Sequence, residues 1–153
     1  MWHAKPWAEL ARDEWHGIVR LRVDVFVVEQ DCPYSDLDGK DLRAWHVWAE
    51  EDSLAKGASA LAYARVLAPG VSYAEPSIGR VATRRDRRSE GLGKELMNQS
   101  IAVCERVWPG QGIRISAQCY LEAWYVDLGF VSVGEPYLED GIPHIQMLRS
   151  AGV

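Results

Sequence analysis

Residues 80–93, Arg-Val-Ala-Thr-Arg-Arg-Asp-Arg-Arg-Ser-Glu-Gly-Leu-Gly, decide the fold of this chain of 153 residues. A β-branched segment over 78–83 predicts a strand that runs through an arginine cluster into two glycines. Apolar residues then recur every three to four positions until Trp108-Pro109-Gly110, which predicts a helix over 91–107. The first N–H groups of such a helix have no intrahelical partner, so the turn is expected to bind an anion.

The spacing of the glycines separates three kinds of phosphate-binding loop. A P-loop has a glycine five residues before its Gly-Lys pair, but here Arg88 stands at that distance before Gly93-Lys94. A dinucleotide-binding loop has a third glycine where this chain has Leu96. What remains, Arg88-Ser89-Glu90-Gly91-Leu92-Gly93, resembles the Arg/Gln-x-x-Gly-x-Gly/Ala signature of the GNAT acyl-CoA N-acyltransferases. The alternative for so short a motif is a solvated basic turn.

A second segment resembles the same family. Trp124-Tyr125-Val126-Asp127-Leu128-Gly129-Phe130 is similar to its Phe-Tyr-x-x-x-Gly-Phe segment. It lies in a helix predicted over 120–128, which Gly129 ends. The resemblance implies that Tyr125 lies beside the thioester sulfur and protonates the departing thiolate. The alternative is a half-buried aromatic residue on an amphipathic helix.

Longer blocks resemble the ElaA-like branch of the GNAT proteins. They are residues 21–30 with Cys32-Pro33-Tyr34, residues 36–41 and residues 139–147. The resemblance implies acetyl-CoA as cosubstrate and a small amine or peptide amine as acceptor. The residues expected to hold acetyl-CoA are Val81, Ala82, Thr83, Arg88, Ser89, Glu90, Gly91, Leu92, Gly93 and Lys94. The sequence does not identify the acceptor, the preferred acyl length or the oligomeric state, and a homodimer stays open.

Composition and charge favour a single domain over residues 1–153. The chain is 48% apolar and 25% charged, as is ordinary for a globular enzyme. It has neither an apolar run long enough for a bilayer nor the apolar core of a signal peptide, so a cytoplasmic location without membrane contact is expected. The net charge of −5 argues against nucleic-acid binding. Three cysteines without paired spacing indicate reduced thiols and no metal site.

Charged residues gather in two groups. The arginines flank the glycine turn, as expected for a small anionic partner; they are Arg80, Arg84, Arg85, Arg87 and Arg88. The acids precede them and are accompanied only by Lys40 and Arg43; they are Glu29, Asp31, Asp36, Asp38, Asp41, Glu50, Glu51 and Asp52. Such a run is predicted to be solvated surface. Any part of it at the mouth of the acceptor site would favour a cationic amine.

The pattern of the whole chain predicts an α/β fold. Helices are expected over 8–29 and 91–107, and strands over 45–49, 58–66, 78–83, 113–117, 130–135 and 144–149. The segments over 78–117 form a strand–helix–strand crossover. The resemblance implies a central mixed sheet, flanked by helices, whose two middle strands splay to admit the acyl-CoA arm.

Direct attack of a neutral amine on the thioester is the favoured mechanism, with Tyr125 as general acid. The candidates for the base are Glu29, His46 and His144, because a histidine or a partly buried carboxylate can reach useful basicity. Each also has a structural interpretation: Glu29 as a helix-end acid, and the histidines as core or surface rings. Strand 78–83 lacks the glutamate that several GNAT enzymes use as base.

Two further hypotheses stay open. Cys119 precedes a predicted helix, which lowers a thiol pKa and favours a covalent acyl-cysteine route. The second hypothesis is that the chain is an acyl-CoA-binding module without catalysis. A protein that only binds acyl-CoA, however, has no need for Tyr125 as a general acid.

Overall fold

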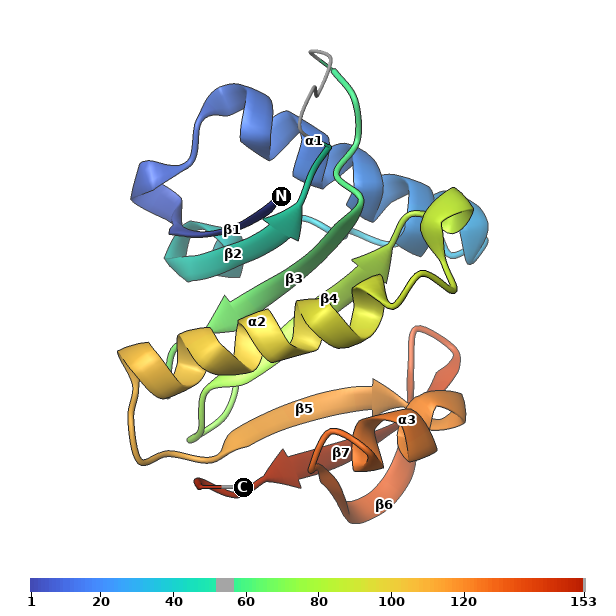
Figure 1. Ribbon diagram of the computed structural model, residues 1–153. Coiled ribbons are helices and arrows are strands. Elements are labelled where there is room, and N and C mark those ends of the chain that lie inside the picture. Colours follow the sequence, from blue (N-terminus) through green and yellow to red (C-terminus); the bar gives the residue numbers. More distant parts are fainter. Residues whose placement is uncertain (52–56, 153) are drawn as a thin grey trace.

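One mixed β-sheet of seven strands forms the centre of the molecule (Figure 1). The structure, a computed structural model, describes residues 1–51 and 57–152. The strands span Trp2–Pro6 (β1), Ala44–Ala49 (β2), Ala62–Leu67 (β3), Ser77–Thr83 (β4), Ile113–Gln118 (β5), Val131–Glu139 (β6) and Ile142–Arg149 (β7). Their order is β1-β2-β3-β4-β5-β7-β6, with β4 and β5 parallel and the other neighbours antiparallel. The predicted α/β fold with a mixed sheet is confirmed.

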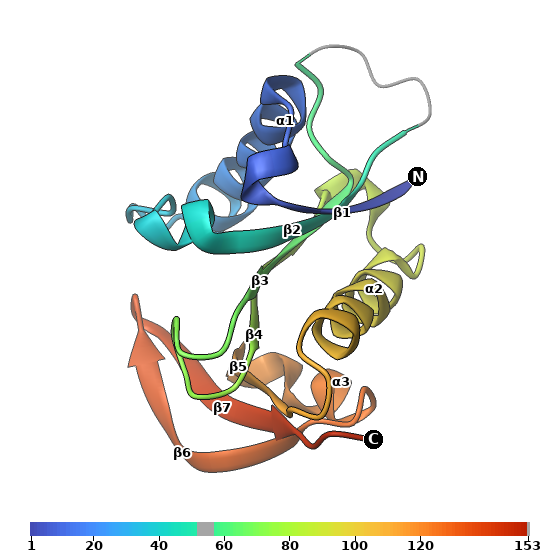
Figure 2. The ribbon, with the colours of Figure 1, turned by 90° about the vertical axis from the view of Figure 1, so that its left-hand side faces the viewer.

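Helices cover both faces of the sheet. Figure 2 shows α1 (Arg12–Arg22) and α2 (Leu92–Val107) on opposite sides of it, and the short α3 (Glu122–Val126) follows β5. A π-helical segment, η2 (Val23–Glu29), continues directly from α1. Segments of this kind are frequent at functional sites. Among the described residues, no helix has the length and apolar character needed to cross a membrane.

Alternation along β3 explains how one strand serves two cores. Ala62, Ala64 and Val66 pack in the core under α2, whereas Tyr63 packs in the core under α1. Successive side chains of a strand point to opposite faces, so a strand covered on both sides is buried throughout. All six residues of β3 are buried, as expected for a strand that helices cover on both faces.

The two middle strands separate, as the family resemblance implied. β4 pairs with β5 at the single register position Ser77–Arg114, and the two strands then diverge (Figure 1). A β-bulge on the other edge of β4 adds to the distortion: the register with β3 shifts around Arg80, whose φ is 52°. The prediction of splayed middle strands is confirmed, and the opening between them positions the site.

Several predicted boundaries are corrected by the structure. The helix expected over 120–128 is a 3-10 turn (Cys119–Leu121) followed by α3. The strand expected from residue 58 begins at Ala62, because the N–H of Ala60 donates to the carbonyl of Gly17 on α1. Strand β1 was not predicted, since its five residues carry no clear alternation and end in proline.

The last two strands are longer than predicted and form a hairpin. Its turn is Asp140-Gly141, with φ of 50° and 77°. Asp-Gly is a strong signal for a two-residue hairpin turn because both residues tolerate positive φ. This turn brings the end of β6 and the start of β7 to the opening between β4 and β5.

Candidate active site

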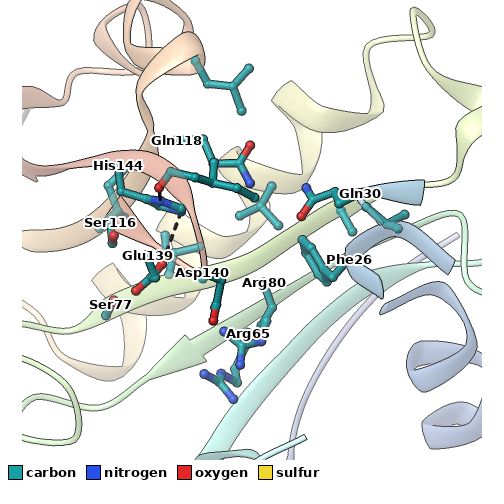
Figure 3. A pocket seen from close by; sticks show the side chains of 18 of the residues that line it. Phe26, Gln30, Arg65, Ser77, Arg80, Ser116, Gln118, Glu139, Asp140 and His144 are labelled. Carbon is teal, nitrogen blue, oxygen red and sulfur yellow. Dashed lines mark hydrogen bonds and ion pairs between the residues drawn. The ribbon is translucent and has the colours of Figure 1, made fainter. Parts of the chain in front are cut away.

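A cavity of about 770 Å³ lies in the opening between β4 and β5. Gly93 and Tyr125 line it from the side of α2, and Arg65 and His144 line it from the other side. Figure 3 shows this second side, where β5 and β7 present Gln118 and His144 opposite the η2 segment. The cavity therefore connects the two faces of the sheet, so that molecules entering from opposite faces can meet in it.

The loop before α2 is built to receive an anion. Ser89 and Gly91 have φ of 73° and 79°, a turned backbone that points successive N–H groups outward. Gly91 is the N-cap of α2 and provides no side-chain cap, so the first N–H groups of this sixteen-residue helix are free for a ligand.

Half of the residues expected to hold acetyl-CoA line the cavity: Val81, Ala82, Thr83, Arg88 and Gly93. The other half form the loop and first turn of α2 outside it: Ser89, Glu90, Gly91, Leu92 and Lys94. The residues expected to hold acetyl-CoA are therefore divided between the cavity and the turn that begins α2.

Three of the arginines in this loop, Arg84, Arg87 and Arg88, already have carboxylate partners. Arg88 holds Glu29 through two hydrogen bonds of 2.6 and 2.9 Å and also donates to the carbonyl of Thr83. Arg84 binds Asp86, and Arg87 binds Glu90. These three side chains are therefore engaged, whereas the first backbone N–H groups of α2 have no side-chain cap.

Tyr125 has the surroundings of a proton donor. Its side chain is only 6% exposed and packs edge-on against Trp124 and Phe130. Its hydroxyl makes no hydrogen bond with any residue in the described ranges, yet the residue lines the cavity. Burial raises the pKa of Tyr125, so the hydroxyl keeps its proton at neutral pH.

His144 and Glu139 form a pair at the far end of the cavity (Figure 3). His144 Nδ1 lies 2.7 Å from the carbonyl of Ile142, which can only accept, so Nδ1 carries a proton. Nε2 lies 3.2 Å from Glu139 Oε2. A proton taken up at Nε2 would thus be held against a carboxylate.

The three candidate bases lie in different places. His144 and Glu29 line the cavity, and Glu29 is held by Arg88. His46 is fully buried against Trp7 and Trp15, away from the cavity, where burial lowers its pKa to about 4. Its nitrogens face the hydroxyl of Tyr63 and the carbonyl of Asp41, which one neutral tautomer satisfies.

Two residues of the acid run are not the solvated surface that the sequence predicts, whereas Glu29, Asp31, Asp38 and Glu51 are exposed as expected. Asp36 and Asp41 are buried, and the equally buried Arg22 binds them at 2.8 and 2.7 Å. Buried Arg65 adds a bond to Asp41, and Arg80 contacts Asp36. We call these five residues the buried ion network. Their partners come from α1, β3 and β4, far away in sequence, which is why local charge density did not reveal them. Asp52 lies outside the described residues.

The structure also brings residues to the cavity that the sequence analysis missed. Ser116 and Gln118 of β5 line it, while Ala117 between them packs in the core. Polar residues alternating with apolar ones in a central strand were an available signal. Arg65 also lines the cavity, and a charged residue within the apolar strand β3 was the corresponding signal there.

The described residues hold no group of three or more potential metal ligands. The three cysteines are free. Cys119 packs against the core and is not among the described residues that line the cavity, so nothing in its position favours an acyl-cysteine.

Comparisons with known proteins agree with this geometry. The sequence matches the family described as "Acetyltransferase (GNAT) domain" over residues 34–150. Protein ElaA of Escherichia coli is 37% identical, with 97% of this chain and 95% of that protein covered. Its crystal structure superposes with a TM-score of 0.89 over 98% of this chain and 99% of the other. An acyl-CoA N-acyltransferase from Pseudomonas aeruginosa, 41% identical over 98% and 99% of the two chains, gives the same TM-score. With its splayed sheet, its uncapped helix and these relatives, the chain belongs to the GNAT acetyltransferase family.

Proposed function

We propose that this protein transfers an acetyl group from acetyl-CoA to a primary amine by direct attack, with Tyr125 as general acid. The observation that supports the proposal is the cavity through the sheet, which is lined by Tyr125, a residue whose hydroxyl has no hydrogen-bond partner among the described residues. The GNAT fold implies an acyl-CoA cosubstrate. The loop over 88–94 would hold its pyrophosphate on backbone N–H groups, and the edge of β4 over 81–83 would hold its arm.

The chemistry needs two proton transfers. The amine nitrogen attacks the thioester carbon and the C–S bond breaks, so the leaving sulfur gains an electron pair and takes a proton from Tyr125. The attacking nitrogen must lose a proton, since an ammonium has no lone pair. We assign this role to His144 Nε2, and the carboxylate of Glu139 at 3.2 Å would stabilise the imidazolium that forms.

Glu29 is the weaker candidate for the base. Its two carboxylate oxygens are both bonded to Arg88, and a carboxylate in a bidentate pair must leave its partner before it accepts a proton. We therefore assign Glu29 to holding the loop that binds the pyrophosphate.

The test is Tyr125→Phe, which removes the hydroxyl and keeps the ring between Trp124 and Phe130. We expect turnover to fall roughly a hundredfold or more, as for a lost general acid, with little change in acetyl-CoA affinity or melting temperature. Release of free CoA thiol, calorimetric titration with CoA and a thermal melt measure the three quantities.

Full turnover in this variant would show that another donor protonates the thiolate. Acetyl-CoA binding without thiol release by the wild-type protein, for every amine tried, would favour an acyl-CoA-binding module instead.

A further inference from the structure

The charges that line the cavity on its acceptor side leave one cation and one anion without an opposite partner. Arg88 is paired with Glu29 and His144 with Glu139. Lys40 donates to the hydroxyl of Ser72 at 2.8 Å and has no carboxylate partner among the described residues. Conversely, the exposed Asp140 carboxylate is in no ion pair within those residues. Both Lys40 and Asp140 line the cavity.

Two arginines beside Lys40 have donors to spare. Arg65 is 5% exposed, and its Nη1 binds both Asp38 at 2.7 Å and Asp41 at 3.1 Å. Its Nε is buried and has no hydrogen-bond partner among the described residues. Arg80 Nη2 donates to the carbonyl of Asp36 and lies 3.6 Å from Asp38 Oδ2. Its Nε is 2.8 Å from an Asp36 oxygen, although not in the direction of a hydrogen bond.

Both guanidinium groups are held at one place because both reach Asp38. The buried Nε atoms are out of a ligand's reach, but Arg65 Nη2 and Arg80 Nη1 donate to no described residue and are not among the buried atoms. A planar carboxylate can accept from such guanidinium N–H groups. Figure 3 shows Arg65 and Arg80 together below Asp140, away from His144.

The spacing along β4 suits a small molecule. Arg65 lies opposite Gly79, and the closed end of the opening is at Ser77, two residues along β4, which is about 7 Å. A side chain at Gly79 would meet nothing within 4 Å. The space beside Gly79, between the two arginines and the opening, is therefore not filled by other atoms of the protein.

We propose that the acceptor amine also carries a carboxylate, as an amino acid does, and that Lys40, Arg65 and Arg80 bind this carboxylate. The amine then lies toward Asp140 and the His144–Glu139 pair. This inference rests on the proposed N-acetyltransferase function and narrows its substrate class. It replaces the expectation of a purely cationic amine, because Asp36 and Asp41 of the acid run are neutralised inside the buried ion network.

The experiment measures CoA thiol release with acetyl-CoA and amino acids in matched pairs. Each free amino acid is compared with its carboxamide, which keeps the amine and loses the negative charge, and with the amine from its decarboxylation. We expect at least one amino acid to react with a kcat/KM ten or more times that of both counterparts.

Lys40→Gln sharpens the test because Lys40 lies outside the buried ion network. This variant should raise the KM for the preferred amino acid about tenfold, bring acid and carboxamide closer together, and leave the KM for acetyl-CoA unchanged. Arg43→Gln is the matched control: it removes a cation from the same 3-10 turn (Gly39–Arg43), but Arg43 is exposed and does not line the cavity.

Two results would overturn the inference, and they differ. The carboxylate site is wrong, while the acetyltransferase function stands, if carboxamides or diamines react as well as the amino acids. The same holds if Lys40→Gln leaves the ratio of kcat/KM between amino acid and carboxamide unchanged. If no amine of any series releases CoA, the proposed function fails together with it.

Discussion

The buried ion network and the arginine loop over 84–90 both pair arginines with carboxylates, but the network lies in the interior and the loop lies at the surface. In the network, the side chains of Arg22 and Asp41 are 0% and 4% exposed. In the loop, Arg87 and its partner Glu90 are 31% and 45% exposed. A charge pair at the surface is screened and contributes little, whereas losing one partner of a buried pair leaves an uncompensated charge. The number of ion pairs therefore says little about which of them stabilise the protein.

The largest effect is expected from Arg22→Met, which keeps the length of the side chain and removes its charge. Asp36 and Asp41 would both lose a buried partner, so we expect a loss of about 3–5 kcal/mol in the free energy of unfolding. Urea denaturation measures it. Arg20→Met, on the same helix but exposed, is the control and should cost less than about 1 kcal/mol. Equal losses in the two variants would show that burial among Asp36 and Asp41 does not set the contribution of Arg22 to stability.

Acid should weaken the network region next. Burial lowers the pKa of His46 to about 4 from an ordinary 6.5, so between these values the unfolded chain binds a proton that the folded chain excludes. The contribution of His46 to the free energy of unfolding is fully present above pH 6.5. The free energy of unfolding falls by on the order of 3 kcal/mol as the pH drops to 4.

Asp41 extends this loss to lower pH. Burial alone would raise the pKa of its carboxyl, but the hydrogen bonds and charges of Arg22 and Arg65 outweigh burial and lower it. The stabilisation from Asp41 is fully present above its pKa in the unfolded chain, about 4. It is lost as the pH falls through the lower pKa of the folded protein. Urea titrations at pH 7, 5 and 4 measure the combined change; a flat profile would contradict the buried, neutral His46.

The smallest effect is expected in the loop. Arg88→Ala removes a bidentate pair with Glu29 whose side chains are 40% and 28% exposed, and it should cost less than about 1 kcal/mol of stability. The cost should shrink further in 0.5 M salt. A double-mutant cycle with Glu29→Gln measures the coupling. A coupling as large as that between Arg22 and Asp36 would mean that exposure does not separate the two clusters.

Local patterns predicted the parts of this molecule that depend on neighbours in sequence. The strand–glycine–helix segment and the period of α2 follow from side chains within a few turns, and they survive in β4 and α2. The splay and the role of Tyr125 came from the family resemblance. Only the splay has been tested.

The buried ion network could not be found in this way. Asp41 lies in the short 3-10 turn that begins after Asp38, directly after Lys40. Nothing in the neighbouring sequence distinguishes a buried acid from a solvated one there. Its burial depends on Arg22 and Arg65, 19 and 24 residues away. Charged residues within the otherwise apolar face of α1 and within β3 were an available signal. They indicate that a buried charge needs a partner, but they do not identify that partner.

The single backbone pair between β4 and β5 has a consequence for the empty protein. An ordinary sheet has two edges, but here β4 and β5 also turn N–H and C=O groups toward the cavity beyond Ser77 and Arg114. Such groups are a template on which a foreign strand can add, a hazard that proteins elsewhere cover with charge, proline or a helix. An acyl-CoA bound in the opening, as proposed, would supply that cover. We therefore expect the substrate-free protein to be the form more prone to aggregation.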